Sequence, residues 1–340
     1  MLEVMRSGLL AQGVRVAAFE AAFARATGAR HAVATSSGTA ALQLALLAHG
    51  IGEGDEVITT PLTFIATANA IVHAGARPVF ADVDDTLNLD PEAVEAAITP
   101  RTRAILPVHL HGCPADLRRL QAIAASHGLL VIQDACQAVG ARLHGLPIGA
   151  HGTACYSLYA TKNITTGEGG MVTTDDEAVA SAVRGLRHQA YTGTAYVHAS
   201  VAHNFRMTEM QAAIGLVQVE RLESLTARRE ANAEYYDRAI HRFCRPARTA
   251  GSRHVFHQYC LLADSRADRD RVLERLAAAG VAAAVHYPVP VHRQPAYRGL
   301  ADDACCPRAE RLAGLIFSIP VHPGLDDRER SQVAAAVNSL

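Results

Sequence analysis

Strand-like and helix-like hydrophobic patterns alternate over the first two-thirds of the chain. Short apolar runs such as 31–35 and 56–60 have the length of buried strands, and each precedes a segment with apolar residues at helical spacing, 39–49 and 63–73. The same patterns predict strands at 77–83, 103–110, 129–133 and 170–174, and helices at 14–26, 91–98, 114–127 and 176–187. Such alternation predicts parallel strands with helices on both faces of the sheet.

The pattern changes in the last third of the chain. Thr208 and Gln211 have the spacing of a capping box, which predicts the start of a long helical region that runs to about residue 240. The segment 245–253 contains Pro, Gly and Ser, a composition typical of a linker or hinge. The remainder predicts strands near 255–262 and 281–287 and helices near 269–279 and 326–338. We expect a large domain over residues 1–240 and a smaller α+β domain over residues 241–340.

Composition limits the classes of function. With 340 residues, of which 49% are hydrophobic and 19% charged, the chain can bury a sizeable core. A net charge of -1 argues against a nucleic acid or an anionic membrane as partner. No apolar run has transmembrane length, and the N-terminus lacks a signal pattern. Seven cysteines, without a Cys-x-x-Cys motif, predict a reduced cytoplasmic protein.

One lysine stands out in a chain whose other basic side chains, histidines aside, are arginines. Lys162 is the single lysine among 32 Lys and Arg residues. Arginine can replace a lysine that serves only as a positive charge, but it cannot replace a primary amine that loses its proton and adds to a carbonyl. The sharper interpretation is therefore a covalent Schiff-base lysine, and the plainer one is a surface lysine that survived by chance.

The run Ser36-Ser37-Gly38-Thr39-Ala40-Ala41 lies between a predicted strand and a predicted helix. At such a junction, free backbone N–H groups and the helix dipole favour a phosphate. An ordinary serine N-cap explains the same residues. The run is neither a Walker loop nor a dinucleotide fingerprint, because the glycine spacings of both are missing.

Asp134 follows a predicted buried strand, at the edge of the sheet where ligands bind in α/β proteins. A carboxylate there can pair with a cationic ring nitrogen of a cofactor, or it can simply cap the next helix. Glycines 167, 169 and 170 suit a loop that approaches a ligand closely, although an ordinary turn before the next strand also explains them. Lys162 fits neither Ser-x-x-Lys nor Tyr-x-x-x-Lys spacing.

His109 and His111 raise the possibility of a metal site, because alternate residues of a strand share a face. No convincing third ligand motif accompanies them, so we favour histidines that line a site or the core, and predict no metal. A phosphate at a helix N-terminus, an aspartate for a pyridine nitrogen and a lysine for an aldehyde together point to pyridoxal 5'-phosphate chemistry.

Taken in order, these segments resemble the DegT/StrS-type sugar aminotransferases, PLP-dependent enzymes that act on nucleotide sugars. The resemblance extends from about Ser7 to the C-terminus. The motifs that carry it are the runs 36–41, 60–67, 107–110, 134–141, 162–170, 203–207, 286–288, 292–297 and 318–322.

The resemblance implies the type I PLP-dependent aminotransferase fold, an α/β fold in which helices sandwich a mostly parallel sheet and a smaller C-terminal α+β domain follows. It also implies a homodimer. Lys162 would form the Schiff base and move protons, Asp134 would hold the pyridine nitrogen protonated, Gln137 would bond the ring hydroxyl and Phe64 would stack on the ring. The remaining implied roles are phosphate binding by Thr39, Ala40 and Ser157, phosphate binding in the partner subunit's site by Asn204, and substrate contacts by His286, Tyr287 and His292.

The chain departs from the family pattern in places. The family usually carries a short segment before the stretch that matches 5–13, and that segment often shapes the substrate mouth. Gln133 stands where an acidic residue is common, and His111 where an aromatic is frequent. Some relatives replace the Schiff-base lysine by histidine and are dehydratases, so the presence of Lys162 favours transamination.

The function expected is amino transfer from an amino acid, by resemblance L-glutamate, to a nucleotide-linked keto sugar. The loop 162–170 resembles the 4-keto branch of the family more than the 3-keto branch. A PLP-dependent sugar dehydratase or lyase, a non-catalytic regulator with the same fold, and a cyclitol ketone as substrate are the alternatives.

Overall fold

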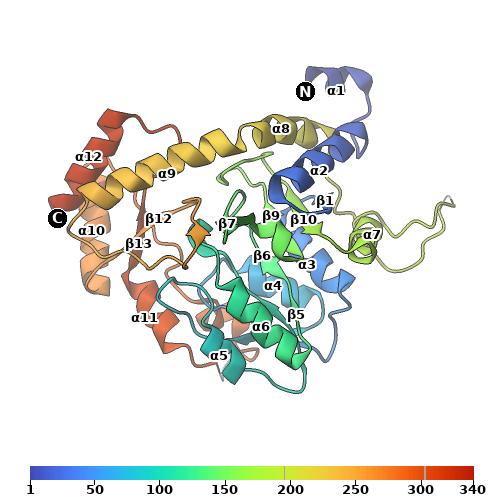
Figure 1. The fold of residues 1–340 in the computed structure, drawn as a ribbon, viewed down its shortest axis with the longest axis horizontal. Coiled ribbons are helices and arrows are strands. Elements are labelled where there is room, and N and C mark those ends of the chain that lie inside the picture. The colour runs from blue at the N-terminus through green and yellow to red at the C-terminus, as the bar shows by residue number, and fades with distance from the viewer. Residues whose placement is uncertain (195, 302–303) are drawn as a thin grey trace.

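Two four-stranded sheets join as the halves of one central sheet (Figure 1). The computed structural model describes residues 1–194, 196–301 and 304–340. One half of the sheet is fully parallel, with the order β3 (Arg77–Phe80), β2 (Glu56–Thr59), β4 (Thr102–Leu106) and β5 (Leu130–Val131). The other half has the order β6 (Gln133–Asp134), β9 (Ala154–Ser157), β10 (Gly170–Thr174) and β1 (His31–Thr35).

The two halves form one surface, because β5 runs into β6 and a parallel bridge joins Val108 to Asp134. Only β10 runs antiparallel to its neighbours in this sheet. The predicted parallel arrangement is therefore confirmed for the other strands. The connection from β9 to β10, residues 158–169, contains Lys162 and no helix, and without a crossover helix the strand that follows returns antiparallel.

Both faces of the sheet are buried, as expected for strands whose alternate side chains all pack on helices. In β1, Ala32 and Ala34 join one core cluster, whereas Val33 joins another on the opposite face. The first face is covered by α2 (Val14–Thr27), α5 (Pro91–Ala96) and α6 (Leu117–His127). The second is covered by α3 (Gly38–Ala48), α4 (Ala66–His73) and α7 (Glu177–Leu186).

A long helical region connects this sheet to the C-terminal part of the chain. It consists of α8 (Glu209–Glu220) and α9 (Leu222–Ala239), which meet at Arg221. The predicted capping box at its start is confirmed, because Thr208 and Gln211 each bond the other's backbone. In Figure 1 this region crosses the molecule from the N-terminal helices to the C-terminus.

A second core lies in the C-terminal part. It gathers residues from the end of α9 and from α10 (Arg266–Ala278), α12 (Asp327–Asn338) and the antiparallel pair β12 (Tyr259–Leu262) and β13 (Ile316–Ile319). The position of the domain boundary near residue 240 stays a prediction. The remaining elements are α1 (Leu2–Ser7), α11 (Pro307–Leu315), the small sheet of β7 (Arg142–Leu143), β8 (Leu146–Pro147) and β11 (Ser252–Arg253), and 3-10 turns at Leu110–Gly112, Ile148–His151, Val291–Arg293 and Pro295–Tyr297.

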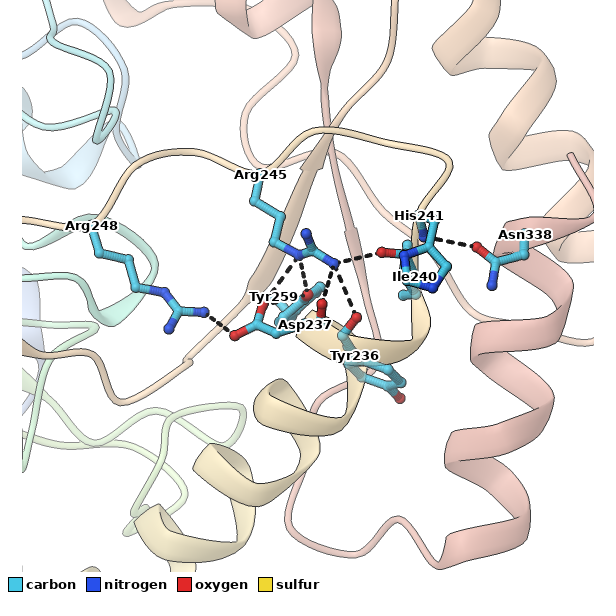
Figure 2. A network of polar contacts seen from close by, with 8 residues as sticks. All are labelled: Tyr236, Asp237, Ile240, His241, Arg245, Arg248, Tyr259 and Asn338. Atoms are coloured by element: carbon cyan, nitrogen blue, oxygen red, sulfur yellow. Dashed lines mark hydrogen bonds and ion pairs between the residues drawn. The ribbon is translucent and has the colours of Figure 1, made fainter.

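Two expectations about the C-terminal part need correction. The segment 281–287 is not a strand; it makes a single bridge, Ala284 to Ser318, and β13 is the partner of β12 instead. Within 245–253, residues 245–251 form a loop, as expected, and Ser252–Arg253 form β11; Arg245 and Arg248 tie this loop to the end of α9, so it is not a free hinge (Figure 2). Arg245 donates to the carbonyls of Tyr236, Asp237 and Ile240 at the end of α9, at 2.7–3.1 Å. A helix C-terminus leaves its last carbonyls without intrahelical partners, and Arg245 supplies donors there; the Tyr236 carbonyl also accepts from Ile240 N at 2.9 Å.

No helix in the described ranges combines the length and the apolar character that a membrane crossing requires.

Candidate active site

A cavity of about 390 Å³ opens at the carboxyl ends of β6 and β9, beside the N-terminus of α3. This is where ligands bind in α/β sheets. Most of the predicted site residues line it, although they come from positions more than 200 residues apart. The predicted residues in its wall are Thr39, Phe64, Asp134, Gln137, Ser157, Lys162, His286 and Tyr287.

The N-terminus of α3 forms one end of the cavity. Ser37 caps the helix, since its Oγ accepts a hydrogen bond from Ala40 N at 3.1 Å. Ser37, Gly38 and Thr39 line the cavity, whereas Ala40, whose N–H is taken by the cap, does not. A Cβ at Gly38 would lie 2.8 Å from Ser157 Cβ, so only glycine lets these two walls meet. The N–H groups and the dipole of this helix end provide a binding place for an anion.

Asp134 is a buried carboxylate at the floor of the cavity, 5% exposed. Its Oδ1 accepts from Cys136 N at 3.0 Å, and its Oδ2 accepts from Thr67 Oγ1 at 2.7 Å. The Thr67 hydroxyl has one proton, so it can receive a hydrogen bond from Thr63, whose Oγ1 lies 3.0 Å away. The chain Thr63, Thr67, Asp134 thus fixes the carboxylate's orientation.

Gln137 connects the cavity wall to the C-terminal part of the chain. Its Oε1 accepts from the backbone N–H of His111 at 2.6 Å, and its Nε2 donates to the hydroxyl of Tyr287 at 3.1 Å. The Tyr287 ring lies 5.9 Å from that of Phe64, at 41°. Burial, followed by the nearby Asp134 carboxylate, raises the pKa of Tyr287, so its hydroxyl keeps its proton near neutral pH.

Lys162 lies in the loop between β9 and β10, half-buried in the cavity wall. Burial lowers the pKa of its amine from 10.5, and the Cys136 and Asp134 side chains oppose this effect. Close packing requires glycine at the end of the loop, Gly169, and at the first residue of β10, Gly170. A Cβ at Gly170 would lie 2.1 Å from the carbonyl oxygen of Ser37, and one at Gly169 would lie 2.4 Å from Thr166 Oγ1. The loop is therefore fitted against the α3 end of the cavity.

Besides Ala40, two predicted residues do not line this cavity. His292 is not among its lining residues, because its 3-10 turn packs toward α11, where His292 Nε2 lies 3.0 Å from Glu310 Oε1. Asn204 is exposed, and its Oδ1 accepts from Arg206 Nε at 2.8 Å.

The histidines considered as metal ligands do not share a strand face. β4 ends at Leu106, and His111, at φ 58°, belongs to a 3-10 turn. His109 Nε2 lies 3.1 Å from Gln133 Oε1, whereas His111 Nε2 lies 3.0 Å from the carbonyl oxygen of His286. Burial lowers the pKa of each imidazole to about 4. Both are buried side chains with separate partners.

Comparison with known proteins decides the family. The sequence model of the DegT/DnrJ/EryC1/StrS aminotransferase family matches residues 1–338. The chain belongs to this family. Membership of this family confirms the predicted enzyme class, a sugar aminotransferase, and the predicted cofactor, pyridoxal phosphate.

Relatives and solved structures of this aminotransferase family align over almost the whole chain. A UDP-N-acetyl-3-dehydro-alpha-D-glucosamine 3-aminotransferase of Acidithiobacillus ferrooxidans is 42% identical, over 94% of this chain and 87% of the relative. A pleiotropic regulatory protein of Geobacillus stearothermophilus is 41% identical, over 98% and 91%. S. venezuelae DesV, solved with a ketimine intermediate, superposes with a TM-score of 0.96 at 40% identity, over 99% of this chain and 92% of the DesV chain. Spr1654 of Streptococcus pneumoniae, solved in PLP and PMP forms, gives 0.94 at 29%, over 99% and 94%. The predicted fold is confirmed by these superpositions.

The donor set of this aminotransferase fits pyridoxal phosphate. Asp134, with both oxygens already oriented by neighbours, suits a cationic ring nitrogen, and the α3 N-terminus suits the phosphate. Phe64, 54% exposed, can cover an aromatic ring, and Lys162 supplies the amine. A methyl group added at Gly38 would lie 2.8 Å from Ser157 Cβ and 3.0 Å from Cys136 Sγ, so this side of the cavity has no room for a side chain at position 38.

Several lining residues were not predicted from the sequence, and three of them bear directly on the site: Thr67, Cys136 and His257. Thr67 lies in one of the family-like runs but carried no role, although a hydroxyl three residues after Phe64 is a possible partner for a buried carboxylate. Cys136 follows Asp134 by two positions, and its thiol has a pKa raised well above 9.0 by burial. His257 had no local signal, because its partners are distant in sequence.

Proposed function

We propose that the chain transfers the amino group of an amino acid, with L-glutamate as the donor, to a keto sugar linked to a nucleotide. The observation that carries this proposal is the single lysine of the chain, placed in one cavity with Asp134 and the α3 N-terminus. The Acidithiobacillus relative, whose name states a UDP-linked 3-keto substrate, supports the substrate class.

The residues of the cavity suit the two half-reactions. Bound pyridoxal phosphate supplies an electron sink for the carbon that loses or gains the amino group. Asp134 would hold the ring nitrogen, the N–H groups of α3 with Ser157 would hold the phosphate, and Phe64 would exclude water from one ring face. Lys162, with its pKa below 10.5, would take the proton from the carbon that bears the amino group and deliver it to a carbon of the bound cofactor, or the reverse, a task for which a neutral amine must be accessible near neutral pH.

A further question is which carbon of the sugar receives the amine. The loop 162–170 favours a 4-keto sugar, whereas the name of the Acidithiobacillus relative favours a 3-keto sugar. We propose that both be offered, nucleotide-linked, to the amine-loaded protein, with return of the visible absorption band as readout. Rapid return with at least one of them supports the proposal, and return with none, while the donor half-reaction proceeds, contradicts it. Product mass separates amine transfer from loss of water.

A regulatory role is the second candidate, because the Geobacillus relative carries the name of a regulatory protein. A protein that binds the cofactor but shows no half-reaction with any amino acid donor would fit that role.

We further propose a homodimer in which Asn204 reaches the phosphate site of the partner. Its side chain is exposed where the backbone bridges His188, at the base of the segments 188–194 and 196–204, which Figure 1 shows leaving the body of the molecule, and this supports the proposal. Sedimentation of the protein tests the dimer. Weakened phosphate binding in Asn204→Ala, with the oligomer intact, would support the contact, and unchanged binding would contradict it.

A further inference from the structure

His257 lies in the cavity wall with Lys162 and is held there from the C-terminal part of the chain. It belongs to the loop between β11 and β12 and is 8% exposed. The loop is fastened to the turn at Gly112, since Val255 N donates to Gly112 O at 3.1 Å. A Cβ at Gly112 would lie 3.0 Å from His257 N, so the glycine permits this close approach. The backbone of His257 is thus fixed relative to the cavity.

Asn163, the residue after Lys162, determines the tautomer of the His257 ring. Asn163 Nδ2 can only donate, and it does so to the carbonyl of Val255 at 3.0 Å. Its Oδ1 therefore faces His257 Nδ1, 3.2 Å away, and can only accept. Nδ1 must carry the proton, and in a neutral imidazole Nε2 then has a free lone pair. Because the Nδ1 edge is turned to Asn163, the Nε2 edge is the one available to the cavity that the ring lines.

The surroundings keep this imidazole neutral. The pKa of His257 is held well below 6.5, and burial is the largest cause. The smaller causes are the positive or ionisable neighbours Lys162, Arg229, His111 and His286. Arg229 is 6% exposed on α9, and its Nη1 donates to the carbonyl of Phe256 at 3.0 Å. Its Nε has no hydrogen-bond partner among the described residues, and burial alone lowers the pKa of the guanidinium to about 10, with no neighbouring carboxylate to oppose it. A buried cation without a carboxylate strongly disfavours a second charge on His257.

Resting on the proposed function, we propose that His257 is a positioning residue for Lys162. The Asn163 side chain fixes the ring in its Nδ1–H tautomer, and the free Nε2 accepts a hydrogen bond from the Lys162 amine whenever that amine is not bonded to the cofactor. The residue next to Lys162 thereby holds the group that orients Lys162. The role of His257 is to keep the released amine aimed at the reacting carbon rather than at solvent.

The single lysine makes a cofactor-free test possible. Protein labelled with 13C at lysine Cε has one lysine resonance, from Lys162, whose titration reports the pKa of the amine. His257→Asn keeps a donor at the Nδ1 position and removes the Nε2 acceptor, whereas His257→Gln places an acceptor near Nε2 and removes the Nδ1 donor. We expect a lower Lys162 pKa in His257→Asn, because the charged amine loses its acceptor, and a value near that of wild type in His257→Gln.

A purely structural role for the ring predicts the reverse order, with His257→Asn normal and His257→Gln impaired, and that result would overturn the proposal. Identical titrations in all three proteins would also overturn it. His127→Asn, an exposed histidine at the end of α6, is the matched control. In the loaded enzyme, His257→Asn should lower kcat on the order of 10- to 100-fold with little change in KM, as expected for a misplaced proton carrier.

A measurement on wild-type protein avoids any folding defect of the variants. Long-range 1H–15N correlation of the His257 ring should show the Nδ1–H tautomer, and an Nε2–H tautomer would contradict the proposal. Neither this spectrum nor the Lys162 titration depends on the sugar, so failure of the substrate assignment and failure of this inference remain distinguishable.

Discussion

The hydrogen bond from Thr67 to Asp134 allows a quantitative test of how the cavity floor is built. In Thr67→Val the shape is nearly kept, but the hydroxyl that donates to Asp134 Oδ2 at 2.7 Å is lost. Both residues are buried, at 1% and 5% exposed, so water cannot replace the donor without local rearrangement. A hydrogen bond to a charged group contributes about 1.5–3 kcal/mol. We therefore expect the free energy of unfolding of the cofactor-free protein to fall by about 2 kcal/mol.

Thr67→Ser is the matched control, because it keeps the hydroxyl and loses only a buried methyl group, which costs about 1 kcal/mol. Urea denaturation at fixed protein concentration measures the stability of the three proteins, and fluorescence titration measures their affinity for pyridoxal phosphate. The reasoning predicts weaker cofactor binding in Thr67→Val, by about tenfold for each 1.4 kcal/mol lost, and nearly normal binding in Thr67→Ser. Equal affinity in Thr67→Val and wild type, or equal damage in both variants, would refute it.

Two further predictions concern stability. His109 is fully buried with a pKa of about 4, so between pH 6.5 and 4 the unfolded chain binds a proton that the folded protein does not. The free energy of unfolding should therefore fall as the pH is lowered through this window, and His109 should account for on the order of 3 kcal/mol of the fall. The fall should be smaller in His109→Gln, because glutamine does not titrate. Equal pH slopes of the unfolding free energy in the two proteins would contradict this. Arg245→Ala removes the donors that hold the end of α9 (Figure 2) and should lower the free energy of unfolding by about 2 kcal/mol, as measured by urea denaturation. Arg245→Lys should restore little of it, because one ammonium cannot reach three carbonyls and Tyr259 together, and full rescue by lysine would show that charge alone matters.

The main sheet could be predicted because its signals are local. Buried strands followed by amphipathic helices leave a periodic pattern, and the predicted strand 170–174 matches β10 in full. The error at 281–287 has a physical reason: this segment is apolar enough for a strand, but β12 takes its partner from 316–319, a run that the sequence analysis left unassigned. Strand pairing depends on contacts distant in sequence, which local hydrophobicity does not report.

The same distinction applies to the candidate site. Lys162 and Asp134 were predictable from composition and from strand-end position, which are properties of the local sequence. The partners that orient them were not, because the contacts of Thr67 with Asp134 and of His257 with Asn163 span 67 and 94 residues. The family resemblance predicted that His292 contacts the substrate. Its contact with Glu310 depends instead on the packing of α11, a helix that was not predicted from the sequence.

Reductive trapping tests the central claim most directly. Protein reconstituted with pyridoxal phosphate is treated with borohydride, digested, and mapped by mass spectrometry. Because Lys162 is the only lysine, the N-terminal amine is the only competing primary amine of the chain. The account predicts one phosphopyridoxyl group per chain on Lys162 and none in Lys162→Arg, since a guanidinium does not lose its proton. An unmodified Lys162, or equal labelling in Lys162→Arg, would contradict the account.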